Sequence, residues 1–173
     1  KSDDYIYPNL LGSFNSGTKV LSEIINQNNT VFCNENILIA KHKDKIVGVL
    51  VYLNKLKSWE NINLSKIPVE LPKGWHETSE DYIINLSQQK EVNEFYVISI
   101  SVDDNYQRQG IGTKMIKYLD YIIAGKSIGL HVLKANDKAV KFYKDLGFEV
   151  TEVLEGYAPR SQKKPTCFYM EKK

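Results

Sequence analysis

The stretch "YQRQGIGTKMIKYLDYI", Tyr106–Ile122, decides the fold, because it places two glycines one residue apart between a strand-like run and a helix-like run. Ahead of it, residues 94–102 read "EFYVISISV", a nearly continuous apolar run that is typical of a strand buried on both faces. Behind the glycines we expect a helix that opens at Thr113 and ends with Gly125 at its C′ position. Its apolar stripe has helical period and contains Met115, Ile116, Leu119, Ile122 and Ile123.

The two glycines, Gly110 and Gly112, suit a phosphate-binding turn. A strand that ends in such a turn and opens a helix aims backbone N–H groups outward at the positive end of the helix, where an anion binds. A Cβ at either position would block the close approach of a diphosphate and restrict the backbone dihedrals. A glycine-containing turn that binds nothing explains these two residues equally well, so other parts of the chain must distinguish the two interpretations.

Two well-known phosphate-binding loops do not match the residues. The Rossmann pattern GxGxxG requires a third glycine where this chain has Met115. The P-loop requires Gly-Lys-[Ser/Thr], but Gly112 is followed by Thr113 and Lys114. Its first glycine would stand at Gln107. A nucleotide-binding α/β domain therefore remains only as an alternative without a matching motif.

Further strands and helices are expected on both sides of this turn. Residues 19–29 carry apolar side chains at helical spacing. Residues 36–54 form two apolar runs around the polar "KHKDK", which predicts an antiparallel hairpin with Asp44 and Lys45 near the turn. Strands are expected at 127–133, 148–154 and 166–172, with a helix at 136–147 closed by Gly147. This order predicts an α/β or α+β sheet with helices packed on it.

Composition limits the class of protein. The chain has 173 residues, 42% of them hydrophobic, which suits one domain over residues 1–173 with a sizeable core. The net charge of +2 and the mixed signs along the chain do not favour nucleic acid or an anionic membrane as partner. No apolar run approaches the roughly 20 residues that span a bilayer, and no signal peptide is visible, so a soluble cytoplasmic protein is expected.

Metal-binding patterns are not found in the sequence. Cys33 and Cys167 stand alone, without the spacing of a zinc site or a disulfide framework. His42, His76 and His131 are scattered and form no HExxH pair. We therefore expect no structural metal, and small buried cysteines.

Two motifs resemble those of one family. Gln107, Gly110 and Gly112 match in spacing the Q/R-x-x-G-x-G/A pattern of the GCN5-related N-acetyltransferases, and "ISV" (100–102) resembles that family's strand end. Residues 136–150 resemble its Asn-x-x-Ala-x-x-Phe-Tyr-x-x-x-Gly-Phe segment, through Asn136, Ala139, Phe142, Tyr143, Gly147 and Phe148. The hairpin at 36–54 is similar to the family's second and third strands. Two motifs at the correct separation are far more specific than one, so the chain is identified as a member of this superfamily.

The resemblance implies a fold, a reaction and a co-substrate. The fold would be of the α/β (α+β) class, with a mixed, mostly antiparallel central sheet flanked by helices and splayed at the acetyl-CoA site. The reaction would transfer an acetyl group from acetyl-CoA to a primary amine of a small molecule or peptide, by direct attack on the thioester. The cofactor would be cradled by the backbone of Gln107, Arg108, Gln109, Gly110, Ile111, Gly112 and Thr113, with the backbone of Ile100 and Val102 pairing with its pantetheine arm.

Three side chains take roles by the same resemblance, each beside a plainer explanation. Tyr143 would be the acid that protonates the leaving thiolate, although it shares a helical face with apolar residues and could belong to the core. Asn136 would hydrogen-bond the cofactor, or it caps a helix. Arg108 stands where many relatives carry glycine, and its guanidinium would pair with a phosphate or be solvated.

No side chain is assigned as the general base. Many relatives place a glutamate on the strand at 96–102, where this chain has Ile98 beside Ser99. Glu94 stands at the start of that strand, and His131 has a suitable intrinsic pKa of about 6.5, yet a histidine between Leu130 and Val132 is more often a residue of the other sheet face. We expect a proton relayed by water, or an amine that arrives neutral.

Substrate choice is expected to reside in residues 54–93, a substrate-side insertion that is longer than a connection requires. It contains Trp59, Trp75, His76, Glu77, Glu80 and Asp81. The acidic residues indicate a cationic amine or a solvated helix start, and the aromatic residues a substrate or homodimer contact. Ahead of residue 19 no strand is visible, so the sheet is expected to be one strand short or the chain truncated. A catalytically inactive acyl-CoA-binding module is the main alternative to an enzyme.

Overall fold

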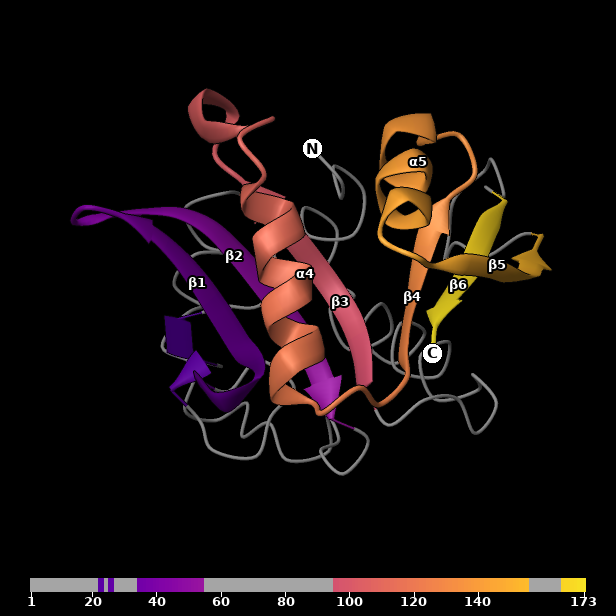
Figure 1. Ribbon diagram of the computed structural model, residues 1–173, viewed down its shortest axis with the longest axis horizontal. Coiled ribbons are helices and arrows are strands. Elements are labelled where there is room, and N and C mark those ends of the chain that lie inside the picture. The colour runs from indigo at the N-terminus through magenta and orange to yellow at the C-terminus, as the bar shows by residue number, and fades with distance from the viewer. Residues whose placement is uncertain (1–21, 24, 27–33, 55–94, 156–165) are drawn as a thin grey trace, which may run out of the picture.

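The protein is built around a mixed β-sheet, and its two longest described helices pack on the same face of it (Figure 1). The computed structural model describes residues 22, 23, 25, 26, 34–54, 95–155 and 166–173. Within them the strands are β1 (Ile37–His42), β2 (Lys45–Asn54), β3 (Phe95–Val102), β4 (Ile128–Leu133), β5 (Glu149–Leu154) and β6 (Cys167–Lys172). The helices are α4 (Ile111–Ile122) and α5 (Asp137–Asp145), with short 3₁₀ turns η1 (Asn34–Asn36) and η4 (Asp104–Tyr106). The six strands lie in the order β1-β2-β3-β4-β6-β5.

The first two strands form the predicted hairpin. β1 pairs antiparallel with β2, and His42 stands opposite Lys45 across the turn. β2 then pairs antiparallel with β3 along its length. Val51 lies opposite Ser99 and Tyr52 opposite Val97, so Ile98 is an extra residue that bulges from β3.

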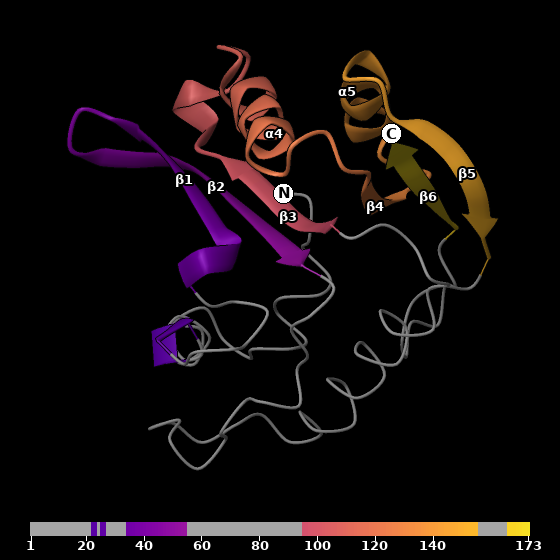
Figure 2. The same cartoon turned by 60° about the horizontal axis from the view of Figure 1, so that its bottom comes forward.

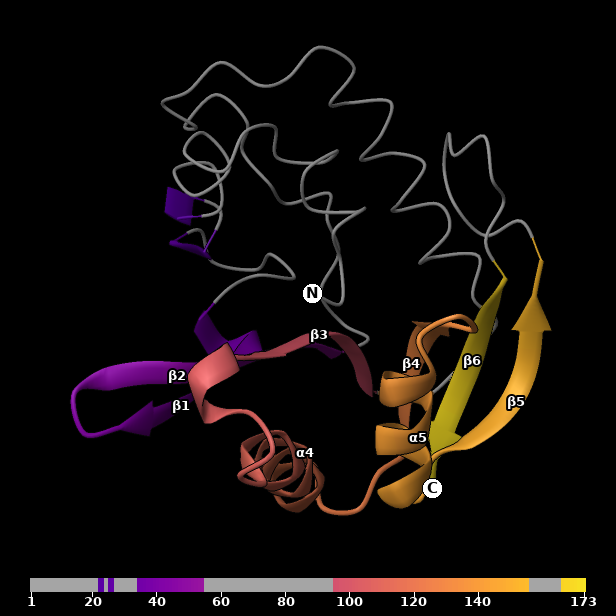
Figure 3. The same cartoon turned by 90° about the horizontal axis from the view of Figure 1, so that it is seen from above.

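The parallel pairing of β3 with β4 is short. It joins Phe95 to Ile128, Tyr96 to Gly129 and Val97 to Leu130, and it extends no further. Beyond these pairs the two strands separate toward their carboxyl ends, as Figures 1 and 3 show. β4 and β5 each pair antiparallel with β6, which completes the second half of the sheet. The sheet is therefore splayed between β3 and β4.

Helix α4 begins at Ile111, two residues before the Thr113 start that the sequence predicts, and Gly110 is its N-cap. At the other end, the Ala124 N–H bonds to the Tyr121 carbonyl and the Gly125 N–H to the Asp120 carbonyl, both at 3.2 Å. These two bonds form a Schellman motif in which Ala124, at φ 57°, is the C′ residue. The expectation of Gly125 at C′ is wrong by one position.

The apolar stripe of α4 faces the sheet, with Met115, Ile116, Leu119 and Ile123 buried. Ile122 does not belong to it, since its side chain is 39% exposed. In β3 only Val97 is buried, so the expectation of a strand buried on both faces is also wrong. The strand is less covered because its neighbour β4 diverges beyond Val97.

Helix α5 has a recognisable cap at each end. The Asn136 side chain accepts a hydrogen bond from the Ala139 N–H at 3.2 Å. The chain leaves the helix through Gly147, at φ 89°, and the Phe148 N–H bonds to the Tyr143 carbonyl at 3.1 Å. The predicted closure of this helix by Gly147 is confirmed by that geometry.

Both helices lie on the same face of the sheet and cover its apolar side chains (Figure 2). The largest fully buried side chains of the described residues are Phe148, Leu50, Ile116, Leu119, Ile128, Leu130 and Met170. They come from α4, from the segment that follows α5, and from strands on either side of the splay, namely β2 on one side and β4 and β6 on the other. One hydrophobic core therefore holds the two halves of the sheet together.

Some expected features lie outside the described residues. Ser22, Glu23 and Ile25 are helical, in agreement with a helix near 19–29, but most of that segment is not described. Of the segment 54–93, Asn54 ends β2 and the remainder is outside the described part, as are Cys33 and residues 1–21. Among described residues, no helix is long and apolar enough to span a membrane.

We predict that Gly129→Ala destabilises the fold. A Cβ at this position would lie 2.1 Å from the Tyr169 hydroxyl, and Tyr169 is only 4% exposed, so its ring has little room to move. Overpacking of this kind costs about 1–3 kcal/mol of unfolding free energy, which urea denaturation measures. In a Tyr169→Phe background the cost should be smaller, and an equal cost in both backgrounds would show that the hydroxyl is not the obstacle.

Candidate active site

The loop between β3 and α4, residues 103–110, has an unusual backbone. Arg108 has φ 58° and Gly110 has φ 75°, both left-handed. A Cβ at Gly110 would meet no heavy atom within 4 Å, so its requirement for glycine is conformational rather than steric. Alternation of left-handed with ordinary residues turns successive N–H groups to one side, which is the geometry of an anion-binding concavity.

Gly112 has a different reason to be glycine. It lies in the first turn of α4, and a Cβ there would be 3.2 Å from Cζ of Phe142 on α5. The missing side chain therefore allows the two helices to approach closely. Sequence reasoning assigned Gly112 to the approach of a diphosphate, and the structure adds this packing role.

The amino-terminal end of α4 offers free backbone donors. The first hydrogen bond of the helix runs from the Lys114 N–H to the Gly110 carbonyl, at 2.9 Å. The N–H groups of 111–113 precede this bond and have no acceptor within the helix. Gly110 supplies no side-chain cap. These donors at the positive end of the helix suit a phosphate group.

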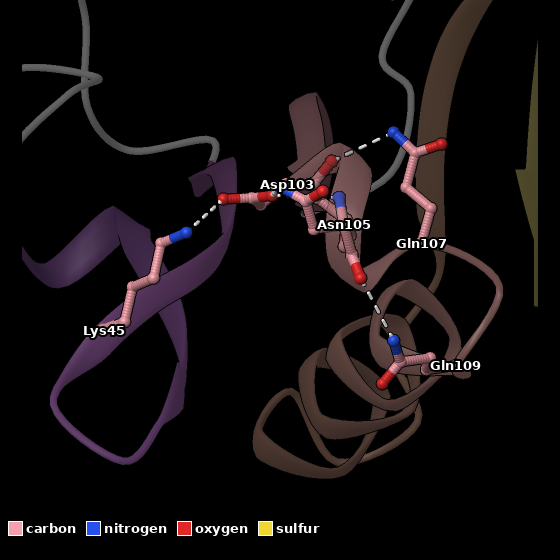
Figure 4. Close-up of polar contacts among 6 residues, drawn as sticks. Lys45, Asp103, Asn105, Gln107 and Gln109 are labelled. Carbon is pink, nitrogen blue, oxygen red and sulfur yellow. Dashed lines mark hydrogen bonds and ion pairs between the residues drawn. The ribbon is translucent and has the colours of Figure 1, made fainter.

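The polar side chains of the same loop turn back onto its own backbone (Figure 4). Gln107 Nε2 donates to the Val102 carbonyl at 3.1 Å and to the Asp104 carboxylate at 2.7 Å. Gln109 Nε2 donates to the Asn105 carbonyl at 3.3 Å. The side chains thus hold the loop, and the backbone remains to face a ligand.

The splayed edge of β3 is the second part of the site. The Asp103 N–H donates to Val47 of β2 at 2.9 Å. Because backbone groups alternate sides along a strand, those of Ile100 and Val102 point the other way, toward the gap beside β4, where the Val102 carbonyl also accepts from the Gln107 side chain. An extended ligand arm could pair there as an added strand.

Tyr143 and Asn136 lie on the helix face of the splay. Tyr143 is 8% exposed, with its ring centroid 5.2 Å from that of Phe142 and 5.6 Å from that of Phe148. Tyr143 is therefore a core residue, as one of the two interpretations of the sequence expected. Its role as an acid stays a prediction. Asn136 acts as a helix cap through its side-chain oxygen, and a contact with a cofactor also stays a prediction.

A tyrosine and a histidine meet on the opposite face. The Tyr96 hydroxyl and His131 Nδ1 are 2.7 Å apart, and the His131 ring centroid lies 4.9 Å from that of Tyr169. Tyr96 is paired with Gly129, and His131 follows the last paired residue of β4, so this contact sits where the splay begins. Burial lowers the pKa of His131 to about 4, which makes the imidazole neutral at pH 7.

Sequence reasoning named His131 and missed Tyr96. The two residues are 35 positions apart, and only the register of β3 against β4 brings them together. The alternation of faces along each strand was the available signal, but it does not give the register between two parallel strands.

Residues 9–148 match the Acetyltransferase (GNAT) family. The chain belongs to this family. The match covers both motifs and the hairpin, and it confirms the resemblance noted in the sequence.

The chain is similar in sequence to named acetyltransferases and in fold to solved ones. An N-alpha-acetyltransferase of Sulfurisphaera tokodaii is 27% identical over 123 residues, which are 69% of this chain and 59% of that protein. The chain thus spans about three fifths of the length of this curated relative. The crystal structure of an N-acetyltransferase from Staphylococcus aureus Mu50 superposes with a TM-score of 0.67 at 19% identity, over 92% of this chain and 81% of that one.

A second solved structure, Arabidopsis thaliana Naa50 in complex with the bisubstrate analogue CoA-Ac-MVNAL, has a TM-score of 0.54 at 19% identity. It covers 90% of this chain and 80% of that chain. These likenesses show the GNAT fold. The expected class, an α/β sheet of mixed strands with flanking helices, is confirmed by them and by the splayed six-stranded sheet.

We predict that His131 makes the stability of this GNAT domain depend on pH. The pKa of His131 is about 4 in the folded state and 6.5 in the unfolded state. Between these two values the unfolded state binds a proton that the folded state does not, so the free energy of unfolding is at its full value above pH 6.5 and decreases as pH falls toward 4. The loss amounts to roughly 3 kcal/mol, measured by urea denaturation across this range.

In His131→Gln that dependence should shrink, whereas His42→Gln, which removes an exposed histidine, should retain it. An unchanged pH profile in His131→Gln would show that other groups cause it.

Proposed function

We propose that this chain is an acetyl-CoA-dependent N-acetyltransferase whose acceptor is the α-amine of a peptide or protein. The observation that carries the proposal is the uncapped start of α4, with left-handed Gly110, beside the splay between β3 and β4. A phosphate cradle and an open strand edge at one place suit a long ligand with a diphosphate and an amide-bearing arm. Membership of the GNAT family supports the same conclusion.

The co-substrate would occupy both features. The backbone of 107–113 would bind the diphosphate, and the backbone of Ile100 and Val102 would pair with the pantetheine arm. This arrangement leads the thioester toward the narrow end of the splay. Arg108 is exposed next to the cradle, where its guanidinium would reach a phosphate. The bisubstrate analogue in the Naa50 structure, with coenzyme A joined to a peptide, supports acetyl-CoA as the donor.

The reaction would be a direct attack of the amine on the thioester carbonyl. The new C–N bond forms, the C–S bond breaks, and the departing thiolate takes a proton. Tyr143 is our candidate donor of that proton, because α5 starts just after the carboxyl end of β4, the strand that borders the splay, and Tyr143 is the buried residue of this helix. A backbone N–H on the open edge of β3 would polarise the carbonyl oxygen.

The acceptor would arrive from the opposite face, where Tyr96 and His131 meet. An imidazole whose pKa is about 4 is too weak a base to hold the proton of an ammonium group. The pair would therefore orient the amine, which would lose its proton directly to water. An α-amine, with a pKa of about 7.7–8.0, is partly neutral near pH 7, whereas a lysine amine with a pKa of about 10.4 is not. This difference favours a peptide α-amine, as does the relative's name.

Two further features remain part of the proposal. Residues 54–93 would supply substrate contacts as an insertion within a single domain over 1–173. Their aromatic residues would serve the acceptor or a homodimer contact.

We predict that acetyl-CoA and coenzyme A, but not NAD or ATP, raise the melting temperature of the protein. A ligand that binds only the folded state stabilises it by mass action. At about 100 times the dissociation constant, the rise should be about 5 °C or more for a chain of this size. No shift with either form of coenzyme A would refute the proposed function.

We predict that Tyr143→Phe lowers the turnover number by about 100-fold or more, because the leaving thiolate loses its acid. The dissociation constant for acetyl-CoA should stay within about twofold of that of the wild type, because the cradle is made of backbone. Thiol release in the presence of a short peptide measures turnover.

Tyr121→Phe is the matched control for this variant, since Tyr121 is an exposed tyrosine on α4. Wild-type turnover in Tyr143→Phe would remove Tyr143 from the mechanism and leave it a core residue.

A further inference from the structure

The β1–β2 hairpin is tied to the loop at 103–110 by an ion pair. Lys45 Nζ, at the start of β2, lies 2.8 Å from the Asp103 carboxylate, just beyond the end of β3. The Lys45 side chain is 56% exposed and that of Asp103 is 27% exposed. These residues are 58 positions apart, so the contact exists only in the folded sheet.

Asp103 is a junction of several hydrogen bonds. Its other carboxylate oxygen accepts from the Asn105 N–H at 3.0 Å and from Asn105 Nδ2 at 3.1 Å. Its own N–H donates to the Val47 carbonyl, and its carbonyl accepts from the Tyr106 N–H at 2.8 Å. One residue therefore joins the hairpin, the end of β3 and the first turn of the loop.

The hairpin also touches the loop through an aromatic ring. The Tyr106 ring centroid is 5.3 Å from Lys45 Nζ and 5.5 Å from the His42 ring centroid. The loop is thus held from one side by the hairpin. Gln107 also fastens the loop, through the hydrogen bond from its side chain to the Val102 carbonyl.

We propose that Lys45 and Asp103 are positioning residues for acetyl-CoA binding: their ion pair holds the 103–110 loop in the shape that presents its N–H groups to the diphosphate. This inference rests on the proposed function. Neither residue needs to contact the ligand. Lys45 is engaged by Asp103, and Asp103 is an anion that would repel a phosphate if it faced one.

The physical basis is pre-organisation. Two residues of the loop, Arg108 and Gly110, have left-handed backbone, which a free chain adopts rarely. Holding that shape before the ligand arrives lowers the ordering entropy that binding must overcome. An exposed ion pair has a small effect, so loss of this one should weaken binding by a few-fold rather than abolish it.

A direct phosphate contact by Lys45 is the rival explanation, and a double-mutant cycle separates the two. If Lys45 acts through Asp103, Lys45→Met and Asp103→Asn each weaken binding, and the double variant is no weaker than the worse single one. If Lys45 binds phosphate itself, Asp103→Asn releases the lysine and leaves affinity unchanged or tighter.

The experiment measures acetyl-CoA binding by calorimetry for the wild type, the two single variants and the double variant. We expect each single variant to have a dissociation constant about two- to fivefold above that of the wild type. The double variant should have a dissociation constant no higher than that of the weaker single variant. Lys45→Arg should restore wild-type affinity. Lys43→Met, which removes the same charge from an exposed residue of the hairpin turn, should bind as the wild type does.

Two further readouts distinguish positioning from a general loss of stability. The KM for acetyl-CoA should rise in Lys45→Met with kcat unchanged, and amide hydrogen exchange over 104–110 should quicken in the ligand-free protein. A wild type that binds acetyl-CoA while both single variants bind equally well overturns this inference alone. A wild type that binds no acetyl-CoA overturns the proposed function, and this inference with it.

Discussion

The structure depends on the short pairing between β3 and β4. These strands share only the pairs from Phe95 to Val97 of β3, whereas β3 pairs with β2 along its whole length. The bulge at Ile98 stands at the point where the pairing with β4 ends. Backbone N–H and C=O groups without partners are costly when they are buried, so an open strand edge inside a sheet requires an occupant or solvent. The splay is therefore both a gap in the hydrogen bonding of the sheet and the opening that we propose for the ligand arm.

The two helices reinforce this opening. Both α4 and α5 begin at the end of the sheet where β3 and β4 separate (Figure 1). Their positive ends face the same end of the sheet, while the apolar residues beneath them join the halves of the sheet into one core. The shared core thus holds the two halves of the sheet together, although β3 and β4 pair at one end only.

Local patterns predicted much of this architecture. The hairpin with its turn near Asp44, the strand-turn-helix around Gly110 and the closure of α5 by Gly147 all follow from short-range residue chemistry. The errors came from tertiary effects. The C′ position of α4 falls on Ala124, one residue after the buried Ile123, and Ile122 is 39% exposed although its spacing fits the apolar stripe. Of the site, the glycine turn at the start of α4 was predictable, whereas the Tyr96–His131 contact and the Lys45–Asp103 pair depend on strand register and on residues far apart in the chain.

The close approach at Gly112 has a consequence for how such a protein can change. Because Phe142 packs next to Gly112 of α4, the helix that starts at the proposed phosphate cradle and the helix that carries Tyr143 are in direct contact. A substitution that fits a larger side chain between them would shift the cradle and the tyrosine together. With the cradle, the acid and the acceptor site placed as we propose, donor affinity and the rate of transfer would be linked at this contact, whereas acceptor preference could vary more freely on the opposite face of the sheet.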